Sequence, residues 1–469
     1  MQVVLTPYYQ DLFPDGKDTL EELLEDIPTV PLLSFIAYLD AELYSRDDGN
    51  ETQLMLLNFM LHKQPAEFRA AIMNNAFSKA SNSGERRFFT RHYNLSFLHY
   101  ILTHFKEGDF EDYTVEQELA VFKAYFLIAE QFGQQPRDEG VPLPSHDADF
   151  FGKMIWPTMA DNYESNFSVY PYHIFLRGMV FFNYLQCHSN YSGYVNAFLQ
   201  RHQKKTSLNY MSDISQILRA NYEANQEGTT EFAPFSLGPA PGFETIYEQF
   251  TLDPVAYAQQ YGNNKANYAG IKSRPLYKVH DKNWLVLNWS FLSNKLYEGL
   301  IFDFYQNSGI AAEAAFNSFP KFKQFIGQHI TEKYLFRQLA DNAWKRKYNV
   351  LLFDDEERTD GFPDGYYRKG NNVFLFEIKD AYFPSAAVNS YAYEQIKAAI
   401  DEKINNPKKG SGQLIKQLQH LKSQAYESPQ RYKSPAHLTI YPIIIYTDLH
   451  FNMPGVNEYV NRTFQNMLG

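Results

Sequence analysis

The amino-acid sequence predicts a multidomain α+β protein. A mostly α-helical region, residues 1–270, and a connecting segment, residues 271–317, precede an α/β domain with a central mixed sheet over residues 318–469. Three observations support this division. The chain has 469 residues, more than one hydrophobic core usually organises. Apolar residues recur three and four positions apart through the first 270 residues, whereas helical and strand-like patterns alternate after about residue 318.

The amino-terminal region is predicted to be a helical scaffold or sensor. Breaks that contain Pro and Gly, such as residues 133–144 and 234–242, separate its helical stretches. No repeat of fixed period identifies a named solenoid. Residues 274–289 mix β-favouring and polar residues, as in 284–289, so they fit either a short strand or the start of a buried helix. Helical spacing covers residues 19–24, 31–43, 51–61, 95–105, 116–132 and 174–185.

The carboxy-terminal region begins with a helix that Ser318 can cap and Pro320 can start. Its apolar stripe runs from Phe322 to Leu339, and the helix carries Glu332. An acidic turn at residues 354–360 and a loop at residues 406–412 separate later elements. These elements are a strand over residues 349–353, a strand over 373–379 after a turn at Asn371-Asn372, helices over 390–404 and 413–424, and a strand over 438–446 buried on both faces.

Composition sets the expected environment. The chain is 44% hydrophobic and 21% charged, which is typical of a globular protein, and its 35 Tyr and 39 Phe residues are expected mainly to pack helices. The single cysteine, Cys187, excludes an internal disulfide and a Cys-rich zinc site. The first 20 residues lack a secretory pattern, and no stretch reaches the roughly 18 apolar residues of a membrane span. We therefore expect a soluble, cytoplasmic protein with no membrane partner.

The net charge of −11 conceals an uneven distribution. Residues 321–469 contain 20 Lys and Arg against 16 Asp and Glu, whereas the rest of the chain contains 23 against 38. The basic excess therefore lies in the predicted α/β domain, where a polyanionic substrate would need it, and the acidic excess lies in the helical region.

Two short motifs carry the predicted chemistry. Glu377 and Lys379 end the apolar run that starts at Val373, and residues two apart on a strand point to the same face. A neighbouring strand or turn can bring Asp364, in Pro363-Asp364-Gly365, beside them. Two carboxylates and an ammonium would then converge, a set that can bind a hard divalent cation and position a water for phosphodiester hydrolysis.

With these motifs and this element order, residues 318–469 resemble the PD-(D/E)XK nuclease superfamily, the restriction-endonuclease-like fold. The resemblance implies that Asp364 and Glu377 hold one or two Mg²⁺ ions, for which Mn²⁺ can substitute. It also implies that Lys379 positions or activates the attacking water. Two further roles follow from the family pattern: Glu332 would complete the metal site, and Gln417 on a later helix would lie near the phosphate.

A basic segment is expected to bind the substrate backbone. Lys408, Lys409 and the backbone amides of residues 410–412 precede a predicted helix and could clamp a phosphate, with Lys416 on that helix. A flexible solvated loop explains the same segment equally well. No pattern for reading base edges is visible, so sequence preference stays open.

Each motif also has a competing interpretation. Asp15-Gly16-Lys17 and Asp401-Glu402-Lys403 also contain D-x-K, but neither lies on a predicted strand. Glu377 and Lys379 could instead be an exposed ion pair at a strand end. His146 and the scattered histidines of the helical region lack metal-ligand spacing, and no phosphate-binding loop is present. His420, one turn after Gln417, could approach the site, but a partly buried surface histidine is the favoured interpretation.

The sequence therefore predicts a Mg²⁺-dependent DNA endonuclease. By analogy alone it is also expected to be the effector of a bacterial anti-phage defence system, with a protein partner or a second copy bound through the helical region. Two alternatives stay open: a catalytically silent nuclease-fold protein that acts in binding or assembly, and a nuclease directed at RNA.

Overall fold

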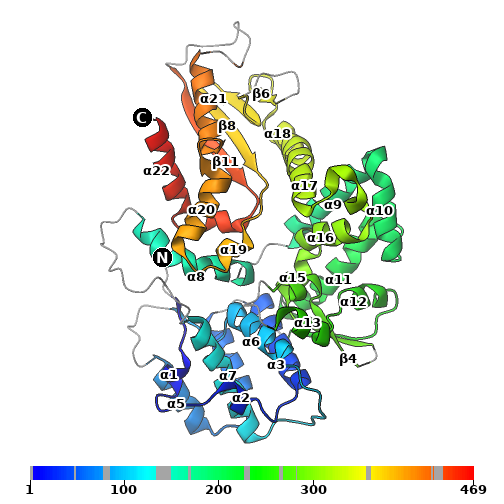
Figure 1. Cartoon of the computed structure of the whole chain (residues 1–469), viewed down its shortest axis with the longest axis vertical. Coiled ribbons are helices and arrows are strands. Elements are labelled where there is room, and N and C mark those ends of the chain that lie inside the picture. The colour runs from blue at the N-terminus through cyan, green and yellow to red at the C-terminus, as the bar shows by residue number, and fades with distance from the viewer. Residues whose placement is uncertain are drawn as a thin grey trace. The chain divides into compact units, whose positions relative to one another are not determined.

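The computed structural model describes residues 4–46, 49–77, 85–133, 149–166, 171–226, 233–262, 268–280, 282–354, 361–423, 426 and 437–468. The chain forms two compact units (Figure 1). The helical unit comprises residues 1–136, 164–179 and 196–307, and the sheet unit comprises residues 137–163, 180–195 and 308–469. Within the described ranges, no helix is long and apolar enough to cross a membrane.

The division differs from the predicted one because parts of the predicted helical region belong to the sheet unit. Trp156, on α8 (Phe150–Asn166), lies in a buried cluster with Tyr393 and Tyr459. Its indole Nε1 donates a hydrogen bond to the carbonyl oxygen of Pro454 at 2.9 Å. Such long-range packing leaves no mark in the local sequence pattern. Two helices, α9 (Pro171–Cys187) and α10 (Ser189–Arg201), also have residues in both units.

The helical unit confirms the predicted helices and the predicted use of aromatic residues in packing. Phe97 of α6 and Phe122 of α7 are fully buried in one large cluster. The unit contains α1 (Tyr9–Leu12), α2 (Leu20–Leu23), α3 (Thr29–Ser45), α4 (Asn50–Met60), α5 (Ala66–Phe77), α6 (Arg91–Thr103), α7 (Val115–Gly133), α11 (Ser207–Gln226), α12 (Glu244–Gln249), α13 (Pro254–Tyr261), α14 (Ala269–Ser273), α15 (Trp289–Asn294) and α16 (Glu298–Asn307). Its strands are β1 (Val4–Leu5), β2 (Glu85–Arg86), β3 (Ser236–Leu237), β4 (Leu276–His280) and β5 (Asn283–Val286).

The ambiguous segment 284–289 proves to contain both a strand and a helix start. Strand β5 lies in the middle of the small sheet β3-β5-β4, and α15 begins three residues after it. Asn288 caps α15, since its side chain accepts a hydrogen bond from the Phe291 amide at 2.9 Å. The buried carboxylate of Asp40 accepts hydrogen bonds from Asn288 Nδ2 and from the Trp289 amide, at 2.9 and 2.7 Å.

The sheet unit is built on a four-stranded mixed sheet in the order β11-β8-β7-β6. Strands β6, β7 and β8 are antiparallel neighbours, whereas β11 is parallel to β8 and follows a long crossover. The strands are β6 (Val350–Phe353), β7 (Gly365–Lys369), β8 (Asn372–Lys379) and β11 (Thr439–Tyr446), with a small hairpin of β9 (Asn405–Asn406) and β10 (Lys409–Gly410). The helical elements are η1 (Ile310–Ala312), η2 (Ala314–Phe316), α17 (Phe319–Phe325), η3 (Ile326–Phe336), α18 (Arg337–Trp344), α19 (Ser385–Val388), α20 (Tyr393–Ile404), α21 (Ser411–Ser423), η5 (Leu449–Asn452) and α22 (Val456–Leu468).

Helices cover both faces of this sheet, as the alternation along β8 predicts. Val373 and Leu375 pack against α21, which lies over the strands in Figure 1, and against Phe464 of α22. Phe376 and Ile378 point to the other face and pack against Phe336 of η3 and α18. The strand is thereby held from both sides, so its carboxyl end is firmly placed.

Several predicted elements need correction. The helix from Ser318 is three successive segments, α17, the wide π-helical η3 and α18, and the Ser318 side chain makes no capping hydrogen bond. The last strand, β11, is not buried on both faces: it lies at the sheet edge, and Tyr441 is 42% exposed. Strand β7 and helix α22 were not predicted, and the predicted 406–412 loop contains β9 and β10. The acidic turn beyond Asp354 lies outside the described residues.

Candidate active site

The β7–β8 hairpin brings the two predicted motifs together. Gly365 pairs in register with Phe376, so the residue before Gly365 lies beside the carboxyl end of β8. Asp364 Oδ2 accepts a hydrogen bond from the Ile378 amide at 2.6 Å. This contact places the Asp364 carboxylate against the Glu377–Lys379 segment.

Glu377 is the most enclosed member of the group. It is 2% exposed, and both of its carboxylate oxygens accept hydrogen bonds. Lys379 Nζ donates to Oε1 at 2.5 Å, and Gln417 Nε2 donates to Oε2 at 2.7 Å. Glu377 and Lys379 thus share one face of β8, on the side of the sheet that α21 covers.

Gln417 of α21 therefore lies at the site that the family pattern suggested. The side chain is 2% exposed, and its Oε1 atom is buried with no hydrogen-bond partner among the described residues. An unpaired buried acceptor is costly unless a donor such as water reaches it. The hydroxyl of Tyr426 donates to the Gln417 backbone carbonyl at 2.9 Å, which steadies this turn of the helix.

Glu332 interacts electrostatically with this group. Burial, followed by the negative charge of Glu377, raises the pKa of Glu332 above its ordinary value, while Lys379 acts in the opposite direction. Burial and the charges of Glu377 and Glu332 likewise raise the pKa of Asp364 from 3.8 to about 8. Three carboxyl groups and one ammonium therefore interact at the carboxyl end of β8.

A neighbouring ion-pair network holds the helix that carries Glu332. The Asp380 side chain is 1% exposed and forms a salt bridge with the buried Lys323 of α17 at 2.6 Å. Thr331 Oγ1 of η3 donates to Asp380 Oδ2 at 2.6 Å, and Thr447 Oγ1 donates to Oδ1 at 2.5 Å. Because Thr331 directly precedes Glu332, this network positions η3 against the end of β8.

The sequence reasoning missed Asp380 and Lys323. A signal was present, since Asp380 is a third charged residue immediately after Glu377-Ile378-Lys379 and must point away from Lys379 on an extended strand. Its buried partner, 57 residues earlier in the chain, could not be inferred from local spacing.

Asp364 and Glu377 are the side chains at this site that could hold a divalent cation. Within the described ranges, no group of three or more His, Cys, Asp or Glu side chains is arranged to hold a metal ion. Mg²⁺, however, usually keeps several waters and uses only one or two carboxylates. Asp364 and Glu377 supply such a pair, and the mutual repulsion that raises the pKa of Asp364 would be relieved by a cation, Mg²⁺ or Mn²⁺.

The predicted phosphate clamp has a different backbone arrangement from the one expected. The amides of Lys408 and Lys409 donate to Asn406 Oδ1 at 2.9 and 3.0 Å, and the Gly410 amide donates to Gln413 Oε1 at 3.0 Å. These three amides are therefore engaged inside the β9–β10 hairpin. The side chains of Lys408, Lys409 and Lys416 are exposed. They remain candidates for contact with the phosphate backbone of a nucleic acid.

The competing motifs lie elsewhere. Asp15 and Lys17 lie in an exposed turn of the helical unit, and Lys403 forms an exposed pair with Glu402 at the end of α20. His146 lies outside the described residues. The His420 ring packs on Tyr426, with ring centroids 5.1 Å apart.

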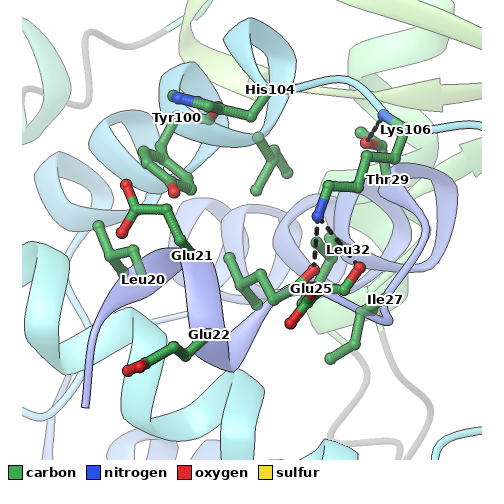
Figure 2. A pocket seen from close by; sticks show the side chains of 12 residues that line it. Leu20, Glu21, Glu22, Glu25, Ile27, Thr29, Leu32, Tyr100, His104 and Lys106 are labelled. Atoms are coloured by element: carbon green, nitrogen blue, oxygen red, sulfur yellow. Dashed lines mark hydrogen bonds between the residues drawn. The ribbon is translucent and has the colours of Figure 1, made fainter.

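A pocket in the helical unit also lacks the predicted site residues. Its volume is about 320 Å³ (Figure 2). The imidazole of His104 stacks on Tyr100 at one side, and Glu21 lies close to this pair. Lys106 Nζ, at the other side, donates to the carbonyl oxygens of Leu24 and Glu25 at 3.2 and 3.1 Å. Lys106 is therefore engaged by the backbone at the end of α2. The predicted site residues all belong to the sheet unit.

Comparison with known proteins identifies no relative of this chain. No protein-family model, curated protein or solved structure matches the chain.

Proposed function

We propose that the sheet unit is a Mg²⁺-dependent nuclease that hydrolyses phosphodiester bonds of DNA. The observation that carries this proposal is the contact of Asp364 Oδ2 with the Ile378 amide at 2.6 Å. Through it, the two separate motifs of the sequence meet at one end of a sheet. The resemblance to PD-(D/E)XK nucleases assigns the same residues to catalysis.

Each side chain has a defined task in this proposal. Asp364 and Glu377 would hold the cation, with Glu332 adding negative charge beside them. A bound Mg²⁺ would offset charge on the phosphate and make water more acidic. Lys379 Nζ, 2.5 Å from Glu377 Oε1, would donate a hydrogen bond that orients the attacking water. Gln417 would fix the Glu377 carboxylate through Nε2 and accept a hydrogen bond from water at its unpaired Oε1.

One observation favours the alternative of a catalytically silent protein. Both oxygens of Glu377 are already engaged, by Lys379 and Gln417. If these contacts persist when a cation is offered, Asp364 alone cannot bind it tightly and the fold would act only in binding or assembly.

A cleavage assay tests the proposal and separates these alternatives. Purified protein is incubated with plasmid, single-stranded DNA and RNA, each with Mg²⁺ and with EDTA. The expected result is Mg²⁺-dependent DNA cleavage that Lys379→Ala abolishes. Lys403→Ala is the matched control, because Lys403 forms a similar short pair with an acidic neighbour, 2.7 Å from Glu402, on an exposed helix end. Cleavage of RNA alone would identify an RNA nuclease, and no cleavage of any substrate would favour the silent alternative.

A bacterial anti-phage effector in the cytoplasm, assembled through the helical unit, remains a prediction from the resemblance. Infection of cells that carry wild-type or Lys379→Ala protein tests it: equal phage titres on both would contradict it.

A further inference from the structure

Four aromatic rings form a row across the sheet, on the face that also carries η3 and α18. Tyr367 of β7 pairs in register with Phe374 of β8, and Phe374 pairs with Tyr441 of β11. Ring centroids are 5.7 Å apart in the first pair and 4.8 Å in the second, with planes tilted by 30° and 15°. Trp344, the last residue of α18, extends the row at 5.3 Å from Tyr367. We call these four residues the aromatic row.

The helices do not fully cover the aromatic row. Phe376, two residues further along β8, is only 5% exposed because Phe336 of η3 and Trp344 of α18 pack on it, with ring centroids 5.6 and 5.0 Å away. Tyr441 is 42% exposed, and Tyr367 and Phe374 are partly exposed. The row therefore presents ring surface at the edge of the helical layer.

A basic turn adjoins the aromatic row. Residues 345–347 are Lys, Arg and Lys, and all three are exposed. Tyr348 follows them and is 86% exposed, the highest value among the exposed large hydrophobic side chains of the described residues. Asn349 Nδ2 donates to the hydroxyl of Tyr367 at 3.0 Å and to the carbonyl oxygen of Trp344 at 3.2 Å, which fixes the turn against the row.

This combination has the chemistry of a surface for unpaired nucleotides. Aromatic rings stack on bases of any sequence, and neighbouring cations contact the phosphates. In a duplex the base faces are already stacked on one another, so such a surface favours single strands. We propose that the aromatic row, with Tyr348 and the basic turn, binds single-stranded DNA. The kind of polymer rests on the proposed function.

Phe374 and Lys379 lie five residues apart on the same strand, a distance of about 16 Å at about 3.3 Å per residue. Because this separation is an odd number of residues, Phe374 points to the face that carries η3 and α18, whereas Lys379 points to the face that α21 covers. The aromatic row is therefore a surface separate from the site at the end of β8.

Sheet stabilisation alone does not explain these residues. Cross-strand aromatic pairs do stabilise sheets, which accounts for Tyr367 and Phe374. It does not account for Tyr348, which contributes almost no buried area, or for three consecutive cations beside it. Charge complementarity with a polyanion accounts for both.

Binding is measured in EDTA, where no cleavage can occur, by fluorescence anisotropy of a labelled 20-nucleotide oligo-dT. Tyr348→Ala and Tyr441→Leu are each expected to weaken binding by about 5- to 150-fold, the range for one lost base stack. Tyr441→Phe should retain affinity because the ring remains. Tyr172→Ala is the matched control, since Tyr172 is 67% exposed and lies in the helical unit.

Three further measurements sharpen the test. An abasic oligonucleotide should bind the wild-type protein more weakly than oligo-dT does. Its affinity should be the same for Tyr348→Ala as for the wild-type protein. Changing Lys345 and Lys347 to Gln should reduce the slope of log affinity against log salt by about 1.4, since each single-strand phosphate contact contributes about 0.7. Oligo-U and duplex DNA should bind less tightly than oligo-dT.

The inference is overturned if oligo-dT does not bind, if Tyr348→Ala and Tyr441→Leu bind like wild type, or if the abasic, RNA or duplex probe binds equally well. Failure of the proposed nuclease is seen separately, because it would leave this binding intact while Lys379-dependent cleavage is absent.

Discussion

Replacing Asp364 with Asn should stabilise the metal-free protein. Asn is nearly isosteric with Asp, and its carbonyl oxygen can still accept the hydrogen bond from Ile378. The replacement removes a carboxyl group whose ionised form is disfavoured by burial and by Glu377 and Glu332. A residue that serves only stability would be expected to show the opposite response.

The magnitude follows from the pKa of Asp364. At pH 7 the unfolded chain carries an ionised Asp364, whereas the folded chain, with a pKa of about 8 instead of 3.8, holds the proton. One pKa unit corresponds to about 1.4 kcal/mol, so the cost at pH 7 is at most about 4 kcal/mol. Because the folded state binds the extra proton, stability falls as pH rises from 3.8 towards 8 and is level above that. The advantage of Asn should therefore be larger at pH 7 than at pH 5.

Hydrogen exchange of the β7–β8 peptides is the suitable assay, since a chain of two units need not unfold in one step. In EDTA at pH 7, exchange in Asp364→Asn should be at least about tenfold slower than in wild type, after correction for intrinsic rates. Adding Mg²⁺ should slow exchange in wild type and have little effect on the variant. Asp341→Asn is the control, because Asp341 has a 45% exposed side chain and pairs loosely with Lys345 at 3.4 Å.

Two results would refute this reasoning. Exchange in Asp364→Asn that is as fast as in wild type at pH 7 would mean that the carboxyl groups do not repel one another. An equal response to Mg²⁺ in both proteins would mean that Asp364 does not bind the cation.

Three other predictions concern positioning, proton linkage and the role of the lysine. Thr331→Val should raise the Mg²⁺ concentration needed for half-maximal cleavage by about tenfold, and Thr331→Ser should restore it. Thr447→Val should have a much smaller effect, because Thr447 bonds the same Asp380 oxygen as Lys323 but does not adjoin Glu332; equal effects would contradict the assignment. Burial, aided by nearby cations, lowers the pKa of His202 to about 4 from 6.5, so stability should fall by up to about 3 kcal/mol as pH falls from 6.5 to 4. In urea unfolding, His202→Phe should remove this fall in the free energy of unfolding between pH 6.5 and pH 4. An unchanged pH profile in the variant would contradict the role given to His202. Lys379→Met should bind Mg²⁺ at least as tightly as wild type, by calorimetry, because Glu377 Oε1 is released, yet cleave at least about 100-fold more slowly; loss of Mg²⁺ binding would contradict the role given to Lys379.

The sequence allowed β8 to be predicted to within one residue, because its continuous apolar run is typical of a strand that helices cover on both faces. Strand β7 escaped prediction because Gly365-Tyr366-Tyr367-Arg368-Lys369 is short and half polar, and β8 supplies the pairing that makes it a strand. The contact of Asp364 with Ile378 was anticipated only as a possibility that such a neighbour would create. Local pattern thus identified the candidate site residues, whereas the strand pairing that brings them together is a non-local property.

The same limit explains the missed helices and the misjudged edge strand. Helix α22 has a mixed sequence in which Phe464 is recognisable as core only once β7 and β8 lie beneath it. The run Ile443-Ile444-Ile445 suggested a central strand, but hydrophobicity does not reveal whether a second strand will pair on the far side. Edge or centre is decided by topology, and topology depends on the whole chain.

Two carboxylates near the end of β8 show why the site is better explained by function than by folding. Asp380 is neutralised by Lys323 and bonded by Thr331 and Thr447, so its burial is fully compensated. Asp364, near the same strand end, receives one amide hydrogen bond and faces other carboxylates, and its pKa rises to about 8. A chain able to compensate one buried carboxylate so completely has no folding reason to leave the other repelled. Under the proposed function, a bound cation would relieve this repulsion, and the unfavourable energy of the free protein would then add to the affinity for that cation.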